Sequence, residues 1–376
     1  MSLAIAGMGW VTPLGRGVDS VWEHLLHGDE ASVTAISEEF GHRPYSVFRV
    51  PESALTGLAY PRLRRASAIS RFAAAAGLDA LRAAGVKLDP QNAERTALIF
   101  AISNGGVIYT KRFYRDVVDA GAQSASPLLF PETVFNAPAS HLAAILGVTG
   151  ATYTLVGDGA VGLAAIKMAE DLMANEPLDH CLVVGTEEVD WLSCDAYRRW
   201  RLLRLAPPIE PFNEQQRGMI LSEGAGAIVL ARDGPFTIEC AHPGGHFTKR
   251  AEAEEILKRI LRDLSQSEID LVIGSANGTF VDQAEYGALK AVVPNAFVYT
   301  AKPALGEGVG AAGLWQVILA AQALRCAELP PVLHADPAIA LRLPLSRTPV
   351  TGARRAIVLS CGVNQQAAGL RLAIWR

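Results

Sequence analysis

The chain has 376 residues, half of them hydrophobic, so it is long enough to bury a large core in two fused halves. Its 34 basic and 38 acidic residues leave a formal charge of −4, which argues against a nucleic-acid partner and against docking on a membrane surface. Five scattered cysteines predict reduced, buried thiols. The two histidines of HPGGHF (242–247) lack a third ligand nearby, so this segment predicts a surface turn and no metal is expected.

The first residues, MSLAIAGMGWVTPLG, predict a strand and not a targeting segment. They contain no basic leader and no cleavage motif, and the apolar run breaks at Gly7. A helix should follow to about His27. Since no apolar stretch of about 18 residues is evident in the chain, we expect no membrane partner and a cytoplasmic location.

Strand-like apolar runs alternate with helical runs along the chain. SRFAAAAGLDALRAAG (70–85) predicts a helix, and ALIFAIS (97–103) predicts a strand. YTLVGDGAVGLAAI (153–166) predicts a strand, a glycine-rich corner and a helix, which is where many enzymes place a nucleophile, yet it contains neither cysteine nor serine. The alternation predicts an α/β fold in which helices sandwich mixed sheets.

Three pairs of segments predict that the fold is duplicated. ALIFAISNGG (97–106) is similar to AIVLSCGVNQ (356–365), and HCLVVGTEE (180–188) is similar to DLVIGSANG (270–278). GDGAVGLAAI (157–166) and GEGVGAAGL (306–314) both start Gly-acid-Gly and continue into a helix of small residues. Small residues at both helix starts predict close packing of these helices between two sheets.

Four blocks, in the same order along the chain, resemble the β-ketoacyl-acyl-carrier-protein synthases of the thiolase fold. They are AIAGMGWVTPLGRGVDSVWEHLLHG (4–28), SPLLFPETVFNAPASHLAAILGVTGATYTL (126–155), PFNEQQRGMILSEGAGAIVLA (211–231) and AKPALGEGVGAAGLWQ (301–316). The resemblance implies a duplicated α/β/α/β/α layered sandwich with two mixed five-stranded sheets. The halves would be 1–233, with a dimer-interface insertion at about 104–150, and 234–376.

In this family a cysteine thiolate at a helix amino terminus takes the acyl chain, and two histidines stabilise the enolate formed by decarboxylation of the malonyl extender. The resemblance places Gly159 at the cysteine and Glu307 at the second histidine. It places Ser275 at the first histidine, with Thr279 as the anchor and a one-residue deletion before Asp282 and Glu285. It therefore implies that this chain has no catalytic residue for condensation.

A supporting frame persists around these positions. The resemblance retains Lys302 and Glu223, which we expect to form a buried ion pair. Asp158 is expected to cap a helix and Glu307 to be a structural acid at a helix start, with a nucleophilic Asp158 and a general-base Glu307 as the alternatives. His141 matches a structural histidine of the family, and the final Gly-Phe-Gly-Gly loop is replaced by Gly-Val-Asn-Gln (362–365).

The resemblance is greatest to the chain-length factors of type II polyketide systems, in particular the partner subunits of aryl-polyene synthesis. It implies a heterodimer with a catalytic ketosynthase, contact with acyl carrier protein and no cofactor. The implied interface residues are Asn136, Thr152, Tyr153, Thr154, Leu155 and Val156. The implied tunnel residues are Ile108, Thr110, Phe113, Tyr114 and Phe135, and the candidate carrier-protein docking residues are Arg62, Arg64, Arg65, Arg198 and Arg199.

Two other functions remain open at this stage. One is a divergent enzyme without the Cys-His-His triad, such as a malonyl decarboxylase, an acyltransferase or a hydrolase. The other is a homodimer that binds acyl chains without a catalytic partner.

Overall fold

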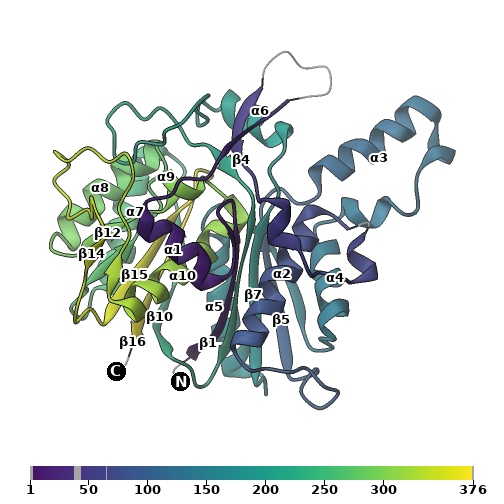
Figure 1. The fold of residues 1–376 in the computed structure, drawn as a ribbon, viewed down its shortest axis with the longest axis horizontal. Coiled ribbons are helices and arrows are strands. Elements are labelled where there is room, and N and C mark those ends of the chain that lie inside the picture. Colours follow the sequence, from purple (N-terminus) through teal and green to yellow (C-terminus); the bar gives the residue numbers. More distant parts are fainter. Residues whose placement is uncertain (1–2, 38–43, 65, 375–376) are drawn as a thin grey trace.

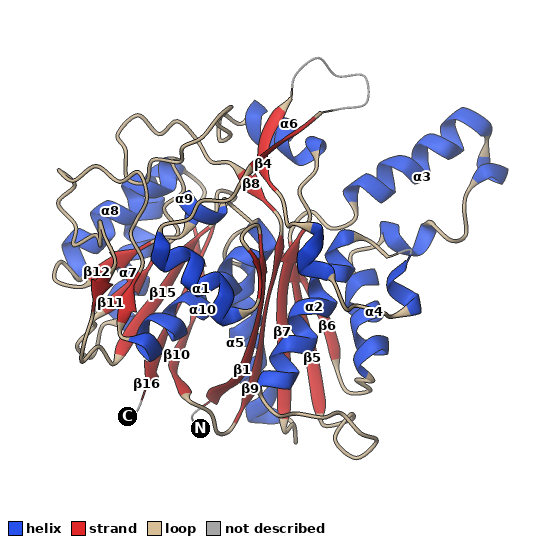
Figure 2. Ribbon diagram, in the orientation of Figure 1, coloured by secondary structure: helices blue, strands red, loops and turns tan. Residues whose placement is uncertain are grey.

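The computed structural model of the chain describes residues 3–37, 44–64 and 66–374. Its main sheet has two halves of five strands each (Figure 2). The first half contains, in spatial order, β6 (Thr152–Val156), β5 (Thr96–Ile102), β7 (His180–Glu187), β9 (Gly224–Ala231) and β1 (Leu3–Thr12). The second half contains β12 (Phe297–Tyr299), β11 (Leu271–Ile273), β15 (Arg355–Cys361), β16 (Gln366–Ile374) and β10 (Phe236–His246).

The two halves have the same topology, which confirms the predicted duplication and the two mixed five-stranded sheets. In each half three parallel strands are followed by two antiparallel ones. Antiparallel pairing of β1 with β10 joins the halves edge to edge. The repeated order is the arrangement expected when one folding unit has been duplicated.

The strand equivalences predicted from sequence are wrong. By position in the sheet β5 corresponds to β11 and β7 to β15, whereas the sequence comparison paired β5 with β15 and β7 with β11. All four are buried parallel strands, and burial on both faces selects the same Val, Ile, Leu and Ala composition in each. The pairing of 157–166 with 306–314 holds, because each segment leads into the helix that follows the edge strand of its half.

Helices cover both outer faces and fill the space between the halves, as Figure 1 shows. On β5, Leu98 and Phe100 pack toward α2 (Ala68–Ala83) and α4 (Ala137–Leu146), while Ile99 and Ala101 pack toward the middle layer. That layer contains α5 (Val161–Asn175) and α10 (Val309–Cys326), which contact strands of both halves. The far face is covered by α7 (Ala253–Leu264) and α8 (Phe280–Val292). The alternation along β5 follows from the two-residue repeat of a strand.

The close crossing of the two middle helices explains the small residues at their starts. A Cβ atom on Gly162 of α5 would lie 2.5 Å from Leu314 Cδ2, and one on Gly313 of α10 would lie 3.2 Å from Gly162 Cα. At Gly159, in contrast, the nearest atom to an added Cβ would be Gly362 Cα at 3.6 Å, which is ordinary contact. Packing therefore requires Gly162 and Gly313 but does not require Gly159.

Helix α10 is long and apolar enough to cross a membrane, contrary to the expectation that the chain holds no such stretch. Since 89% of it is buried inside the fold, we assign it as a core helix. Its interior position between two sheets accounts for an apolar surface on all sides.

Smaller elements complete the described structure. The remaining helices are α1 (Val18–His27), α3 (Val107–Ala120), α6 (Trp191–Arg199) and α9 (Lys302–Leu305), with short 3₁₀ turns η1 (Glu52–Leu55), η2 (Pro61–Arg64), η3 (Ala122–Ser124), η4 (Phe130–Thr133) and η5 (Arg250–Glu252). The remaining strands are β2 (Gly15–Arg16), β3 (Val33–Ile36), β4 (Tyr45–Phe48), β8 (Leu221–Ser222), β13 (Glu328–Leu329) and β14 (Thr348–Pro349). Most of HPGGHF lies in β10, where the register shifts after His242, so the predicted turn is instead an irregular strand.

Candidate functional site

The residues predicted to lie at the degenerate centre follow the carboxyl ends of the parallel strands. Asp158 and Gly159 follow β6, and 274–278 follow β11. Lys302 follows β12, and Gly362 follows β15. The carboxyl ends of parallel strands share one edge of a sheet, where α/β proteins place their ligands. Both halves therefore contribute to a single candidate site.

A buried ion pair occupies the centre of this site. Lys302 Nζ lies 2.6 Å from Glu307 Oε1, and both side chains are 7% exposed. The other oxygen of Glu307 accepts a hydrogen bond from Asn277 Nδ2 at 2.8 Å. The backbone of Glu307 is held by β8, because its N–H donates to Ile220 O and its carbonyl accepts from Ser222 N. Glu307 is thus a fully partnered structural acid.

The predicted pair between Lys302 and Glu223 is wrong. Glu223 has other partners. Its carboxylate accepts hydrogen bonds from Arg49 Nε at 3.1 Å and from the backbone N–H groups of Val50 and Val189. Burial raises the pKa of Glu223, and Arg49 opposes that rise. Lys302 is instead paired with Glu307, the residue that the resemblance places at the second histidine.

The loop after β11 brings Asn277, and not Ser275, to face Glu307. Ser275 Oγ accepts from Cys361 N at 3.0 Å and contacts Glu285, so it points away from the Lys302–Glu307 pair. Asn277 Oδ1 accepts from Thr279 Oγ1 at 2.7 Å while its amide donates to Glu307. Asn-Gly-Thr (277–279) could have been aligned directly with the family's His-Gly-Thr, and the choice of Thr279 as the later anchor concealed this match.

Two fully buried carboxyl groups hold this loop. Asp282 accepts from the N–H groups of Phe212, Asn277 and Gly278, and Glu285 accepts from Ser275 N with both oxygens. Desolvation raises the pKa of Asp282 to about 7 and that of Glu285 to about 8. The Asp-x-x-Glu pattern therefore shapes the backbone of the site.

Replacing Glu285 with glutamine should reduce the pH dependence of stability. The pKa of Glu285 is about 8 in the folded chain against an ordinary value of 4.5, so the folded chain holds this proton more tightly between those values. The stabilising contribution is complete below the lower value and is lost as the pH rises toward the higher one. The unfolding free energy of the wild type should fall through this window more steeply than that of Glu285→Gln, by up to about 1.4 kcal/mol per pH unit.

Denaturant unfolding between pH 5 and pH 9 measures this difference. Asp282 titrates in both proteins, so subtracting the two curves isolates Glu285. Parallel curves across the whole range would show that Glu285 is ionised in the folded chain.

The corner before α5 is held by Asp158. Its carboxylate accepts from Ala160 N at 3.3 Å and from Asn364 N at 2.9 Å, which links the helix start to the 362–365 loop. A Cβ on Gly362 would lie 1.9 Å from Asp158 Oδ2. Burial raises the pKa of Asp158, and the hydrogen bonds oppose that rise. The expected helix-capping role of Asp158 is wrong, because the N-cap residue of α5 is Ala160 and the helix has no side-chain cap hydrogen bond; Asp158 instead joins the turn before the helix to the 362–365 loop.

Sequence reasoning missed a further buried acid beside the site. Glu187, at the end of β7, accepts from Ser103 N and Asn104 N through Oε2, whereas its Oε1 has no partner in the described structure. Desolvation raises its pKa to about 8. A charged residue directly after a buried apolar strand was the available signal.

The arrangement offers no activated nucleophile among the described residues of the site. Burial raises the pKa of the Cys361 thiol well above its ordinary value, so a reactive thiolate is disfavoured. The hydroxyl of Ser360 donates to Gly159 O at 2.8 Å, and that of Ser275 is engaged as described. The centre is built of structural polar contacts.

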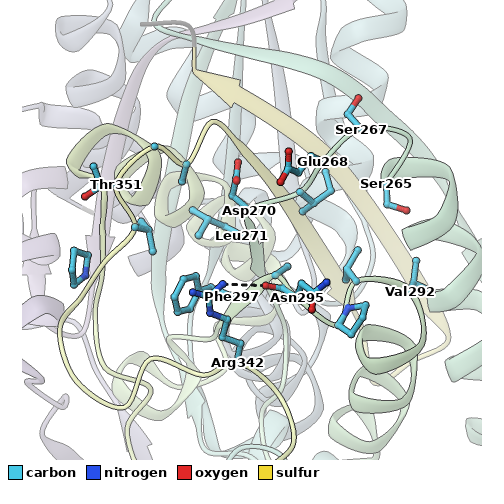
Figure 3. Close-up of a pocket in the computed structure, with 18 residues that line it drawn as sticks. Ser265, Ser267, Glu268, Asp270, Leu271, Val292, Asn295, Phe297, Arg342 and Thr351 are labelled. Atoms are coloured by element: carbon cyan, nitrogen blue, oxygen red, sulfur yellow. Dashed lines mark hydrogen bonds between the residues drawn. The ribbon is translucent and has the colours of Figure 1, made fainter.

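A groove of about 660 Å³ lies at the opposite edge of the second half, shown in Figure 3. It is lined by the segments that precede β11, β12 and β15, including Asp270, Asn295 and Thr351. Arg342 covers the ring of Phe297 there, with its guanidinium carbon 3.6 Å from the ring centroid. Because these are the amino-terminal ends of parallel strands, the groove is separate from the candidate site.

Within the segment 104–150, α4 packs on the body beside α2, and the part before it, 104–136, forms an arm with α3 projecting outward (Figure 1). Helix α3 contains no buried residue. Large apolar side chains are exposed along the arm and on the neighbouring edge strand β6: Tyr114, Val118, Leu128, Phe130, Val134, Phe135, Tyr153 and Val156. Within the described chain β6 pairs with β5 alone, so its other edge is available to a partner.

The predicted tunnel and interface residues lie on this surface. Phe113 packs against Tyr114 and Phe130, with ring centroids 5.8 Å and 5.6 Å away. Ile108 and Thr110 are half-buried in the first turns of α3, and Phe135 covers Gly105. In β6, Thr152 is exposed and Thr154 and Leu155 are half-buried, while Asn136 is exposed directly before α4.

The predicted docking arginines form two separate groups. Arg62 and Arg64 are exposed on η2, and Arg65 lies outside the described residues. Arg198 and Arg199 end α6, where Arg199 pairs with Asp195 at 2.8 Å. The four described arginines therefore lie on two different elements, η2 and α6.

Comparison with known proteins identifies β-ketoacyl synthase domains along most of the chain. The profile of the β-ketoacyl synthase amino-terminal domain matches residues 2–234, and that of the carboxy-terminal domain matches residues 231–336. Nodulation protein E of Rhizobium leguminosarum bv. trifolii is 25% identical, over 88% of each chain. The 3-oxoacyl-[acyl-carrier-protein] synthase 2 of Staphylococcus aureus is 24% identical, over 88% of this chain and 90% of the relative.

Solved structures show the same fold. A β-ketoacyl synthase from Burkholderia phymatum superposes with a TM-score of 0.87 at 19% identity, covering 100% of both chains. A ketosynthase in complex with its chain length factor from Xenorhabdus doucetiae matches with a TM-score of 0.83 at 18% identity, covering 100% of this chain and 98% of the other. The chain belongs to the β-ketoacyl synthase family and has its thiolase-like fold.

Proposed function

We propose that this chain is a non-condensing ketosynthase subunit, a chain-length factor, that pairs with a catalytic β-ketoacyl synthase and shapes the tunnel for the growing acyl chain. The observation that carries the proposal is the centre itself. The resemblance places Gly159 at the family's cysteine, Ser275 at the first histidine and Glu307 at the second. In the structure Lys302 and Asn277 are bound to Glu307. A thioester would meet no nucleophile there and no pair of histidines to stabilise an enolate.

The arm and the edge strand support the partner role. An exposed strand edge flanked by apolar side chains is a surface that proteins normally cover. A solved neighbour from Xenorhabdus doucetiae is described as a ketosynthase in complex with its chain length factor, which is the assembly proposed here. An acyl carrier protein would deliver the chain to that assembly, and an aryl-polyene product and a cytoplasmic location are further parts of the proposal.

A divergent enzyme is the second candidate, favoured by one observation: the curated relatives include a 3-oxoacyl-[acyl-carrier-protein] synthase. Intact mass analysis distinguishes the two. Incubated with acyl and malonyl carrier protein, this chain alone should gain no acyl mass and release no carbon dioxide, whereas its mixture with a catalytic ketosynthase from the same organism should form product. A covalent acyl adduct on this chain alone would contradict the proposal.

Phe113 is the proposed gate of the tunnel. Its ring is half-buried between Tyr114 and Phe130 on the face that would meet the partner. Replacing Phe113 with alanine removes this ring, so the chain-length distribution of the heterodimer's product should shift to longer chains. Mass spectrometry of the released products checks this, with Asp119→Ala, at an exposed polar position of the same helix, as the control. An unchanged distribution would exclude Phe113 as a gate.

A further inference from the structure

The base of the arm contains a buried carboxylate that lies outside the candidate site. Glu132 lies in η4, between α3 and α4, and is only 8% exposed. Its Oε1 is 2.6 Å from His141 Nε2 on α4, and its Oε2 accepts from Ser67 N at 3.3 Å. Ser67 is the N-cap residue of α2, so the carboxylate lies where the helix dipole favours negative charge.

The same short turn also holds the first turn of α3. Thr110 Oγ1 donates to Thr133 O at 3.3 Å. A Cβ added to Gly106, the residue before α3, would lie 2.2 Å from Glu132 O. The η4 turn is therefore in direct contact with the start of the projecting helix, while its acidic side chain is bound to α2 and α4.

The hydrogen bonds of Glu132 with His141 and Ser67 favour its ionised form. Burial would raise its pKa, but the hydrogen bonds from His141 and Ser67 outweigh that effect and the pKa is lowered. Glu132 also acts on Tyr109, the third residue of α3. Burial and the negative charge of Glu132 raise the pKa of the Tyr109 hydroxyl, and the positive charge of Arg71 lowers it. Removing the carboxylate would leave the buried Ser67 N–H and the ring N–H of His141 without this acceptor.

We propose that Glu132 is a positioning residue: it fixes the direction in which the arm leaves the body and thereby sets the affinity for the ketosynthase partner. The inference rests on the function proposed above. Glu132 joins α2 and α4 in the body to the turn that seats α3, and α3 with its returning segment carries the exposed Tyr114, Val118 and Phe130. A tilt at this base would displace all three from their contact surface.

The experiment measures two quantities for each variant: amide hydrogen exchange in the free chain, and the dissociation constant with the catalytic ketosynthase that forms the complex. For Glu132→Ala, amides of 107–135 should exchange faster while those of β5 and β7 keep their rates, and binding should weaken about tenfold. Glu132→Gln retains one acceptor oxygen and should recover most of this loss. Asp119→Asn is the control, since it removes an exposed carboxylate from the same arm.

Three outcomes decide the proposal. Wild-type exchange in the arm, or wild-type affinity, for Glu132→Ala would overturn it, as would faster exchange spread evenly over β5 and β7. If that variant does not fold, Gly106→Ala perturbs the same contact from α3 and must give the same local exchange and weaker binding. Failure of the unmodified chain to bind the ketosynthase would contradict the proposed function, and the exchange rates would still decide on Glu132.

Discussion

Replacing Lys302 with methionine should lower the unfolding free energy of the chain by about 3–5 kcal/mol. The substitution leaves Glu307 buried and charged, with Asn277 as its remaining side-chain partner. The Lys302–Glu307 pair is buried at the carboxyl ends of the strands, so little solvent can reach Glu307 to replace the lost ammonium. Chemical denaturation monitored by fluorescence measures the change.

Two further variants test whether the loss of the Lys302–Glu307 pair causes the fall in unfolding free energy. Lys302→Met combined with Glu307→Gln removes the stranded charge and should regain most of the lost stability. Lys167→Met is the matched control, because Lys167 forms a surface pair with Glu170 and should change stability by less than about 1 kcal/mol. A single Lys302 variant as stable as the Lys167 control would show that the Lys302–Glu307 pair does not stabilise the fold.

Replacing Val156 with aspartate should weaken the complex with the ketosynthase about a hundredfold or more. Val156 is 52% exposed at the end of β6, and the proposed interface would bury it. An unpaired carboxylate in an apolar interface loses its hydration without gaining a partner. The free chain should keep its stability, because the same position faces solvent there. Titration followed by light-scattering mass measurement checks both expectations.

Val33→Asp is the control for this prediction. Val33 is 46% exposed on β3, which belongs to a separate three-stranded sheet, so an added charge there should leave binding unchanged. Equal affinity of the Val156 and Val33 variants would place the interface elsewhere.

The layered fold was largely predictable from the sequence, because short apolar runs typical of buried strands alternate with longer runs typical of helices. The small residues at Gly162 and Gly313 correctly predicted a close helix crossing. The pairing of repeated strands failed, since β5, β7, β11 and β15 face the same environment and have similar compositions. The boundary between residues 233 and 234 stays a prediction.

The candidate site was predictable in composition but not in contacts. The resemblance implied that Lys302 and Glu223 lie near one another. Which acid pairs with the lysine depends on the turn between α9 and α10, which brings in Glu307, and on Arg49 from a distant segment, which binds Glu223. Asn277 was missed because the loop after β11 is shorter than the family pattern. The Glu132–His141 contact depends on how the arm folds back onto α2, which no local pattern specifies.

Co-expression of this chain with catalytic ketosynthases from the same organism tests the central claim most directly. Native mass spectrometry of the purified material should show a one-to-one complex that extends acyl chains, and this chain expressed alone should be insoluble or inactive. A stable homodimer of this chain that condenses acyl and malonyl carrier protein without the ketosynthase would contradict the account.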